Sequence, residues 1–465
     1  MKKIVFLLAM VGSAAQALTL DQYLEQARQK NSLFQAYEMA VQAADDKVDS
    51  AGLDLSPVLT ASYLKGVDKS LPSQISNERN ISQYSIGLAK KFITGTSIKL
   101  QGDLADYKNP GTAFPGFDQY STGALGVSVS QSLWKDFFGY GTRTKLQREK
   151  SAAQIERTAA ELQRRAYLIQ MEADFWDYIV ASEDVRLKKA NLERAEKLQK
   201  WTANRVSNGI SDKADLMNIK ALTSLRSVQY QNSVEDLKTA ETKIRENLGL
   251  SADQATPTID GQMTQERNYI KSLASSKNVL SLEAEVARLE ASTKKNVADE
   301  VTDQLRPDLS VFGTYATTSY NRDRSEAISK VTDSDYPKTS VGVQFSWVIE
   351  TDAKSGARGA SQKEALASQY KAERKVKDGV NAWNELLRKY QVAVSNVKTL
   401  EDVATFQRER SKAEQDKFLK GRTVTANVVT AETDAAEAEV NLLKAKSGLR
   451  KLEASSQLFF AENNK

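Results

Sequence analysis

The sequence contains no cysteine and no histidine. A chain without cysteine has no disulfides, which suits an exported protein that relies on its core or on assembly. Histidine is the commonest general base and a frequent metal ligand, so its absence argues against hydrolytic or zinc chemistry. The formal net charge is only +5, and it falls to +3 if Lys2 and Lys3 are removed with a leader. Such a balance argues against nucleic acid as a partner.

The sequence also lacks the local patterns of known catalytic sites. We find no glycine-rich phosphate loop, no cluster with metal-ligand spacing and no nucleophile elbow. Carboxylates are plentiful, but on helices this charged most of them form solvated faces. We therefore expect a protein that is not an enzyme and that needs no metal or cofactor.

Residues 1–17 predict a signal peptide. Lys2 and Lys3 precede an apolar run over 4–11, and a small-residue tripeptide, Ala-Gln-Ala, ends at Ala17. The alternative of a membrane anchor is disfavoured because the apolar run is too short to span a bilayer as a helix. We expect export out of the cytoplasm.

The remainder of the chain shows one order of elements twice, over 18–265 and 266–465. Each half is expected to run as helix, strands, long helix, glycine turn and helix. The first half predicts a helix over 20–53, strands within 58–133, a long helix over 143–207 and a helix over 211–250. The second half predicts a helix over 269–305, strands within 309–348, a long helix over 357–420 and a helix over 423–462.

Both long helices show the spacing of a coiled coil. Apolar residues recur at alternating intervals of four and three, and Trp176 and Trp383 lie in similar segments, "ADFWDYIVA" and "VNAWNELLR". Such heptads usually mean an ordinary bundle core. The length of these helices, roughly 95 Å each at 1.5 Å per residue, exceeds what a compact domain of this size accommodates. We therefore expect an elongated α-helical coiled coil.

A glycine ends each long helix, in "RVSNGISDKADL" (205–216) and "KFLKGRTVTANV" (417–428). Gly209 and Gly421 are expected in the left-handed conformation that follows a helix end, so that the chain can reverse. Ser211 and Thr423 are candidate caps for the returning helices.

The strand segments alternate between apolar and polar residues, as in 96–106, where Ile98, Leu100 and Leu104 oppose polar neighbours. This pattern fits a half-buried sheet in water or the wall of a membrane barrel. Segments of about ten residues, long polar loops and aromatics at strand ends favour the membrane. The six expected strands are 58–66, 83–92, 96–106, 121–133, 309–319 and 339–348. The aromatics expected at the membrane interface are Trp134, Phe137, Phe138 and Trp347.

Six strands cannot close a barrel alone, because single-chain barrels begin at about eight. Unpaired strand edges in lipid are too costly, so the barrel is expected to be shared among subunits. The order of these features resembles the TolC family of outer-membrane efflux proteins. The resemblance covers the mature chain and includes "LTLDQYLEQARQKN" (18–31), "VSVSQSLWKDFFGYGTR" (127–143) and both glycine turns.

The resemblance implies an α+β membrane protein of the outer membrane: a homotrimer with a shared transmembrane β-barrel, continuous with a long periplasmic helical barrel. It also implies a periplasmic adaptor protein and an inner-membrane transporter as partners, contact with outer-membrane lipid and no catalysis. In the family the turns form the entrance and the adaptor-docking surface. The docking candidates are Ser207, Asn208, Gly209, Ile210, Leu419, Lys420, Gly421 and Arg422.

The sequence departs from the family pattern in two places. Members carry aspartates after the second turn, whereas this chain has Asn427 and Thr430; its acids follow the first turn, as Asp212 and Asp215. These four residues are the entrance candidates, and Asp215 either forms a cation-favouring ring in the trimer or only complements a helix dipole. Many members also have four strands per subunit, and the alternative to six is that 83–106 forms a hairpin outside the barrel wall.

Three functions fit these features. The leading one is an exit duct that conducts small molecules passively in a tripartite efflux system. The runner-up within the same fold is the exit duct of a type I protein secretion system. A periplasmic coiled-coil scaffold or adaptor explains the heptads but leaves the six alternating strands unused.

Overall fold

The computed structural model describes residues 17–69, 78–112, 114–251, 253–259, 269–276, 278–333 and 336–461. The expected signal peptide therefore lies outside the described residues, apart from Ala17. The chain divides into two compact units. The first unit contains residues 1–42, 157–285 and 374–465, and the second contains 43–156 and 286–373.

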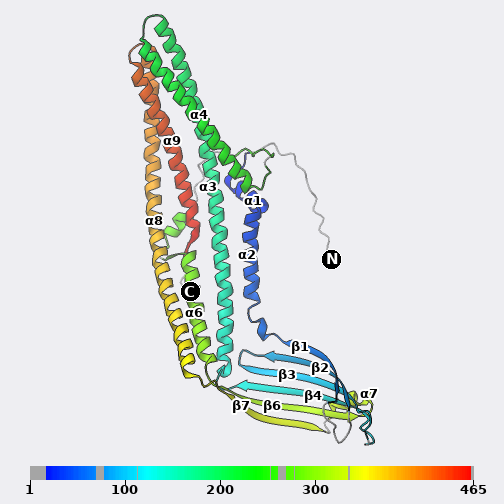
Figure 1. Cartoon of the computed structure of the whole chain (residues 1–465). Coiled ribbons are helices and arrows are strands. Elements are labelled where there is room, and N and C mark those ends of the chain that lie inside the picture. The colour runs from blue at the N-terminus through cyan, green and yellow to red at the C-terminus, as the bar shows by residue number, and fades with distance from the viewer. Residues whose placement is uncertain are drawn as a thin grey trace. The chain divides into compact units, whose positions relative to one another are not determined.

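Most of the chain is helical (Figure 1), and four of the helices have residues in both units. The helices of the chain are α1 (Leu20–Lys30), α2 (Ser32–Asp49), α3 (Tyr140–Ser207), α4 (Lys213–Asn247), α5 (Tyr269–Ala274), α6 (Leu282–Gln304), α7 (Arg324–Ser329), α8 (Thr351–Leu419) and α9 (Thr425–Ser455). α3 and α8 have 68 and 69 residues and follow the two strand regions, where the heptad patterns predicted long helices.

The helix expected over 20–53 is broken at Asn31 into α1 and α2. The Asn31 side chain accepts a hydrogen bond from the backbone N–H of Phe34 at 2.9 Å, which caps the start of α2. Its Nδ2 donates to the carbonyl oxygens of Glu246 and Asn247, the last residues of α4, at 3.2 and 3.3 Å. Asn31 thus joins a helix start to a helix end far along the chain.

The helix expected over 269–305 is interrupted as well. Between α5 and α6 the chain forms a strand, β5 (Val279–Ser281), which pairs antiparallel with β8 (Phe459–Ala461) near the end of the chain. Val279 and Leu280 of β5 are buried. Ser281 then accepts a hydrogen bond from the N–H of Ala284 at 3.2 Å, so α6 begins with a side-chain cap.

Each of the two tryptophans that the sequence aligned lies in a hydrophobic core of the first unit. Trp176 of α3 packs with residues of α1 and with the end of α4. Trp383 of α8 packs with α5, with β5 and with Phe459 of β8, whose ring centroid is 5.4 Å away. The two cores tie each long helix to the segments that flank it in its own half of the sequence.

The second unit contains one sheet of six antiparallel strands, which lie side by side in Figure 1. The strands are β1 (Val58–Asp68), β2 (Arg79–Lys91), β3 (Thr96–Lys108), β4 (Gln119–Ser132), β6 (Asp308–Asn321) and β7 (Pro337–Ser346), in the order β1-β2-β3-β4-β6-β7. The hairpin over 83–106 is therefore part of the sheet, between β1 and β4, and does not lie outside it.

The register of the sheet gathers most of the large apolar strand residues on one face. Leu88 lies opposite Leu59 and Leu100, and Leu100 lies opposite Val127 on the next strand. Because side chains alternate along a strand, this register places one set of residues of every strand on the same face. The large apolar residues of this face are Leu59, Tyr63, Val67, Tyr84, Ile86, Leu88, Ile98, Leu100, Leu104, Leu125, Val127, Val129, Leu309, Val311, Tyr315, Val341, Val343 and Phe345.

Candidate functional site

The two glycine turns have the same backbone geometry. Gly209 and Gly421 adopt φ angles of 71° and 69°. After α3, Ile210 N–H donates to the Arg205 carbonyl at 2.8 Å and Gly209 N–H to Val206 at 3.1 Å. After α8, the N–H groups of residues 422 and 421 donate in the same pattern, at 2.8 and 2.9 Å. Both helices therefore end in a Schellman motif, in which glycine avoids the strain of a left-handed residue.

All eight docking candidates are exposed: Ser207, Asn208, Gly209, Ile210, Leu419, Lys420, Gly421 and Arg422. We call residues 207–210 the first turn and residues 419–422 the second turn. The fold brings the two turns together within the first unit (Figure 1). The ring centroids of Trp201 and Phe418, which precede the two turns in the sequence, lie 4.5 Å apart. The Arg205 guanidinium lies 4.7 Å from the centre of the Trp201 ring.

The helix caps expected at Ser211 and Thr423 are not formed. Ser211 donates to the carboxylate of Asp215 at 2.7 Å, and Thr423 donates to Glu414 at 3.0 Å. The N-cap positions belong to Asp212 and Val424, and neither side chain makes a capping bond. The turns therefore depend on their backbone geometry and on bonds between side chains.

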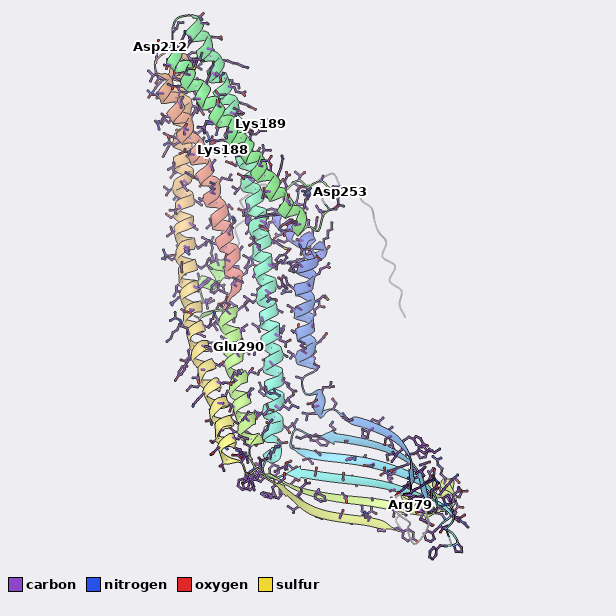
Figure 2. The ribbon with its side chains drawn as sticks, in the orientation of Figure 1. Arg79, Lys188, Lys189, Asp212, Asp253 and Glu290 are labelled. Atoms are coloured by element: carbon purple, nitrogen blue, oxygen red, sulfur yellow. The ribbon has the colours of Figure 1, made fainter. Side chains whose placement is uncertain are left out.

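The entrance candidates lie at the starts of the two returning helices. Asp212 follows the first turn and is exposed (Figure 2), and Asp215 is half-buried near the N-terminal end of α4. Asn427 and Thr430 are exposed at the start of α9. One chain thus places two acids at the start of α4 and two neutral polar residues at the start of α9, next to the paired turns.

A charged cluster below the turns escaped the sequence analysis. Arg194 of α3 donates to Glu432 of α9 at 2.9 Å, and Ser411 of α8 donates to the same carboxylate at 3.1 Å. Arg226 of α4 donates to Thr433 of α9 at 2.8 Å. The cluster links α3 and α4, which flank the first turn, to α8 and α9, which flank the second turn. No local pattern signals it, because Arg194 and Glu432 are 238 residues apart.

The four aromatics expected at a membrane interface lie at one end of the sheet, where β4 and β7 end beside the start of β6. Trp134, Phe137, Phe138 and Trp347 are each about half exposed. The Lys354 ammonium lies 5.2 Å from the centre of the Trp347 ring. Exposed aromatics with polar neighbours are typical of the boundary between lipid and water.

The junction between β4 and α3 is strained and closely packed. Asp136 and Phe138 have positive φ angles of 55° and 44°, which are uncommon for residues other than glycine. Gly139 has φ 80°, and a Cβ atom there would lie 1.8 Å from the carbonyl oxygen of Ile93 in the β2–β3 turn. Only glycine therefore fits this approach of two backbones.

Two aspartates hold the junction together. The Asp136 carboxylate accepts from the N–H and hydroxyl of Thr142 at 2.8 and 2.6 Å and pairs with Lys91 at 2.9 Å. Desolvation is the largest single influence on Asp136 and favours protonation, but these partners together outweigh it and lower its pKa. Asp303 accepts from the N–H of Asp136 at 2.9 Å. Burial, the largest influence on Asp303, raises its pKa.

Within the described ranges, no helix is long and apolar enough to cross a membrane. The same ranges contain no group of three or more carboxylates that could hold a metal ion.

No protein-family model and no curated protein matches the chain. Its fold nevertheless matches solved structures of outer-membrane channels. The outer membrane protein VceC from Vibrio cholerae gives a TM-score of 0.64 at 14% identity, covering 94% of this chain and 95% of VceC. The Campylobacter jejuni CmeC outer membrane channel gives 0.62 at 10% identity, with 94% and 85% covered. The open state of the Neisseria gonorrhoeae MtrE channel gives 0.60 at 13% identity, with 94% and 87% covered.

At these identities the likeness is one of fold. The chain thus has the fold of outer-membrane channels, which is the fold that its resemblance to the TolC family predicted.

Proposed function

We propose that this protein is the outer-membrane exit duct of a tripartite efflux system, a homotrimer that conducts small molecules passively across the periplasm and the outer membrane. The observation that carries the proposal is the open six-stranded sheet with one continuous apolar face, in a chain with the fold of outer-membrane channels. A periplasmic scaffold would leave this apolar face exposed to water, which soluble proteins avoid.

The edges of this sheet support a barrel shared between copies. β1 and β7 are the edge strands, and among the described residues neither pairs with a further strand on its outer side. In lipid each unpaired backbone group costs several kcal/mol. In the proposed trimer, β1 of one copy pairs with β7 of the next, giving eighteen strands from three sheets of six. The apolar face then contacts outer-membrane lipid, and the aromatics beside Trp134 and Trp347 lie at its periplasmic boundary.

The glycine turns are the proposed periplasmic entrance. Their exposed residues, 207–210 and 419–422, are the surface on which a periplasmic adaptor would dock, and an inner-membrane transporter would load the duct. The exposed side chains of Ile210 and Leu419 offer apolar contacts, and Lys420 and Arg422 offer positive charge. Three copies of Asp215 around the axis would form an acidic ring.

Fractionation and single-channel recording test the proposal. We expect the exported protein in the outer-membrane fraction, and discrete conductance steps with cation preference from the purified trimer in a planar bilayer. Recovery in the soluble periplasmic fraction would contradict the proposal and favour a scaffold. An inserted trimer without conductance steps would contradict conduction by the duct on its own.

The acidic ring is tested by Asp215→Asn. Removing three negative charges from a narrow path should reduce the preference for cations. Asp253→Asn is the matched control, because Asp253 lies in the loop after α4 (Figure 2) and is exposed. An unchanged ion preference in Asp215→Asn would show that this carboxylate does not face the conduction path.

A further inference from the structure

A cavity of about 340 Å³ lies in the first unit, below the two turns. It is lined by residues of all four helices of the two hairpins, α3–α4 and α8–α9. We propose that this cavity binds a compact, largely apolar molecule with one negative charge, such as an aromatic carboxylate. The site lies within one chain, so this inference does not depend on the trimer or on conduction.

The walls of the cavity are mostly apolar, and the size suits a small aromatic molecule, since ligand sites in proteins begin at about 300 Å³. The Trp201 and Phe418 rings, 4.5 Å apart, close the side toward the turns, and Arg205 covers the Trp201 ring. The apolar lining residues are Ala195, Leu198, Trp201, Leu222, Phe418, Leu419 and Val428.

The charged lining residues are Arg194, Lys197, Arg226 and Glu432, so the lining carries two positive charges in excess, and of these cations only Arg226 is buried. Arg194 and Glu432 both line the cavity and neutralise each other as an ion pair at 2.9 Å. Arg226 is only 5% exposed, and its guanidinium donates to two neutral side chains, Gln229 and Thr433, each at 2.8 Å. Burial is the largest influence on Arg226 and lowers its pKa, although the Glu432 and Glu437 carboxylates raise it and so compensate its charge in part. A bound anion at the Arg226 guanidinium, whose hydrogen bonds go only to neutral side chains, would add to that compensation.

Asn191 adds an unsatisfied donor to the same lining. Its side chain is buried, and its Oδ1 accepts a hydrogen bond from Arg194. Its Nδ2 has no hydrogen-bond partner within the part of the chain that the structure describes. Buried donors are normally satisfied, so an unsatisfied one next to a cavity favours a ligand that brings an acceptor oxygen. A carboxylate has two such oxygens and matches both Asn191 and Arg226.

A ligand in this cavity would contact both hairpins at once. The ring of an aromatic carboxylate would pack against the Trp201 and Phe418 side, and the carboxylate would lie toward Arg226. Such a ligand would act as a brace between the hairpins and stabilise their packing. This role differs from docking on the turns, whose exposed residues lie outside the cavity apart from Leu419.

The test is calorimetric titration of the full-length protein in detergent with 2-naphthoate, beside its neutral isostere 2-naphthamide. Titration of detergent alone corrects for partition into micelles, which does not saturate. We expect saturable binding of one naphthoate per chain, at least about tenfold weaker binding of the amide, and a loss of about tenfold in Arg226→Gln, as for a hydrogen bond to a charged group. Asn191→Leu should weaken binding as well.

Arg186→Gln is the matched control for Arg226→Gln, because Arg186 is an exposed arginine of α3 that pairs with Glu183 and does not line the cavity. Its affinity should equal that of the unchanged protein. Absence of saturable naphthoate binding, or equal affinities for naphthoate and naphthamide, would overturn the proposal. The comparison of the two ligands needs no substitution, so it decides the question even where Arg226→Gln does not fold.

Discussion

Replacing Gly139 by alanine should destabilise the protein far more than the same change at Gly209. Both glycines have positive φ angles, 80° and 71°, so both variants carry the cost of a left-handed alanine, about 1–2 kcal/mol. At Gly209 the new Cβ meets no atom within 4 Å. At Gly139 it would lie 1.8 Å from the Ile93 carbonyl oxygen, so the backbone of the β2–β3 turn would have to move.

The overlap at Gly139 sets the size of the effect. Overpacking of a site that cannot relax costs about 1–3 kcal/mol, so we expect a total of about 2–5 kcal/mol for Gly139→Ala against about 1–2 kcal/mol for Gly209→Ala. Gly448 lies inside α9 at an ordinary φ with open space around it. Gly448→Ala should therefore stabilise the protein by up to about 1 kcal/mol.

Thermal unfolding followed by far-ultraviolet circular dichroism measures these three variants under one set of conditions. We expect the highest unfolding temperature for Gly448→Ala, a lower one for Gly209→Ala and the lowest for Gly139→Ala. Equal losses at Gly139 and Gly209 would refute the reasoning, because they would show that the close approach of the two backbones at the junction does not exist.

Three further predictions concern the sheet, the junction and the cluster below the turns. Leu100→Lys should block insertion into the outer membrane, because a lysine that faces lipid costs about 2–4 kcal/mol at the bilayer midplane. Gln101→Lys, on the opposite face of the sheet, should insert normally. Membrane fractionation compares the two variants. Asp136→Asn, in which asparagine tolerates the positive φ, should be less stable than the unchanged protein at neutral pH. The pKa of Asp136 is lowered below its usual 3.8 in the folded protein, so the ionised carboxylate stabilises the fold above about pH 3.8 and loses this effect as the pH falls through the folded-state pKa. The unfolding temperatures of Asp136→Asn and of the unchanged protein should therefore converge in acid. Glu432→Gln should lower the free energy of unfolding by about 1–3 kcal/mol, which is less than the loss for a fully buried pair because the Arg194 side chain is 40% exposed. Glu385→Gln, which removes one partner of a surface ion pair, should change the free energy of unfolding by less than about 0.5 kcal/mol. Chemical unfolding measures both variants, and equal effects would contradict the role given to the cluster.

The sequence predicts the features that depend on local patterns. Period-two alternation around Leu100 identified the strands of the sheet, because the face on which a strand residue lies follows from its parity alone. The two glycine turns were equally visible, since Gly209 and Gly421 each end a long heptad pattern and only glycine adopts the left-handed conformation without strain.

Features that depend on distant partners were not predictable. The break at Asn31 needs the carbonyl groups at the end of α4, and β5 needs β8 to pair with. The caps expected at Ser211 and Thr423 failed because each returning helix begins one residue later, with Asp212 and Val424 at the N-cap positions. The cluster around Glu432 joins segments that only the fold brings together.

The division of the chain into two repeats, 18–265 and 266–465, stays a prediction. The compact units of the structure follow a different division, because the long helices α3 and α8 each continue from one unit into the other. The roles of the turn residues and of the acids after Gly209 likewise remain proposals until the duct is assembled and measured.

Intermolecular disulfide cross-linking tests the shared barrel most directly. The chain has no native cysteine, so every disulfide comes from the introduced pair. Ser62→Cys on β1 is combined in turn with Lys338→Cys, Ser340→Cys or Gln344→Cys on β7, which share its face of the sheet. Ser62→Cys with Val343→Cys, on the opposite face, is the control. The account predicts oxidised dimers and trimers in outer membranes for at least one same-face pair and none for the control. Monomers alone across the whole series, from protein that has inserted, would contradict it.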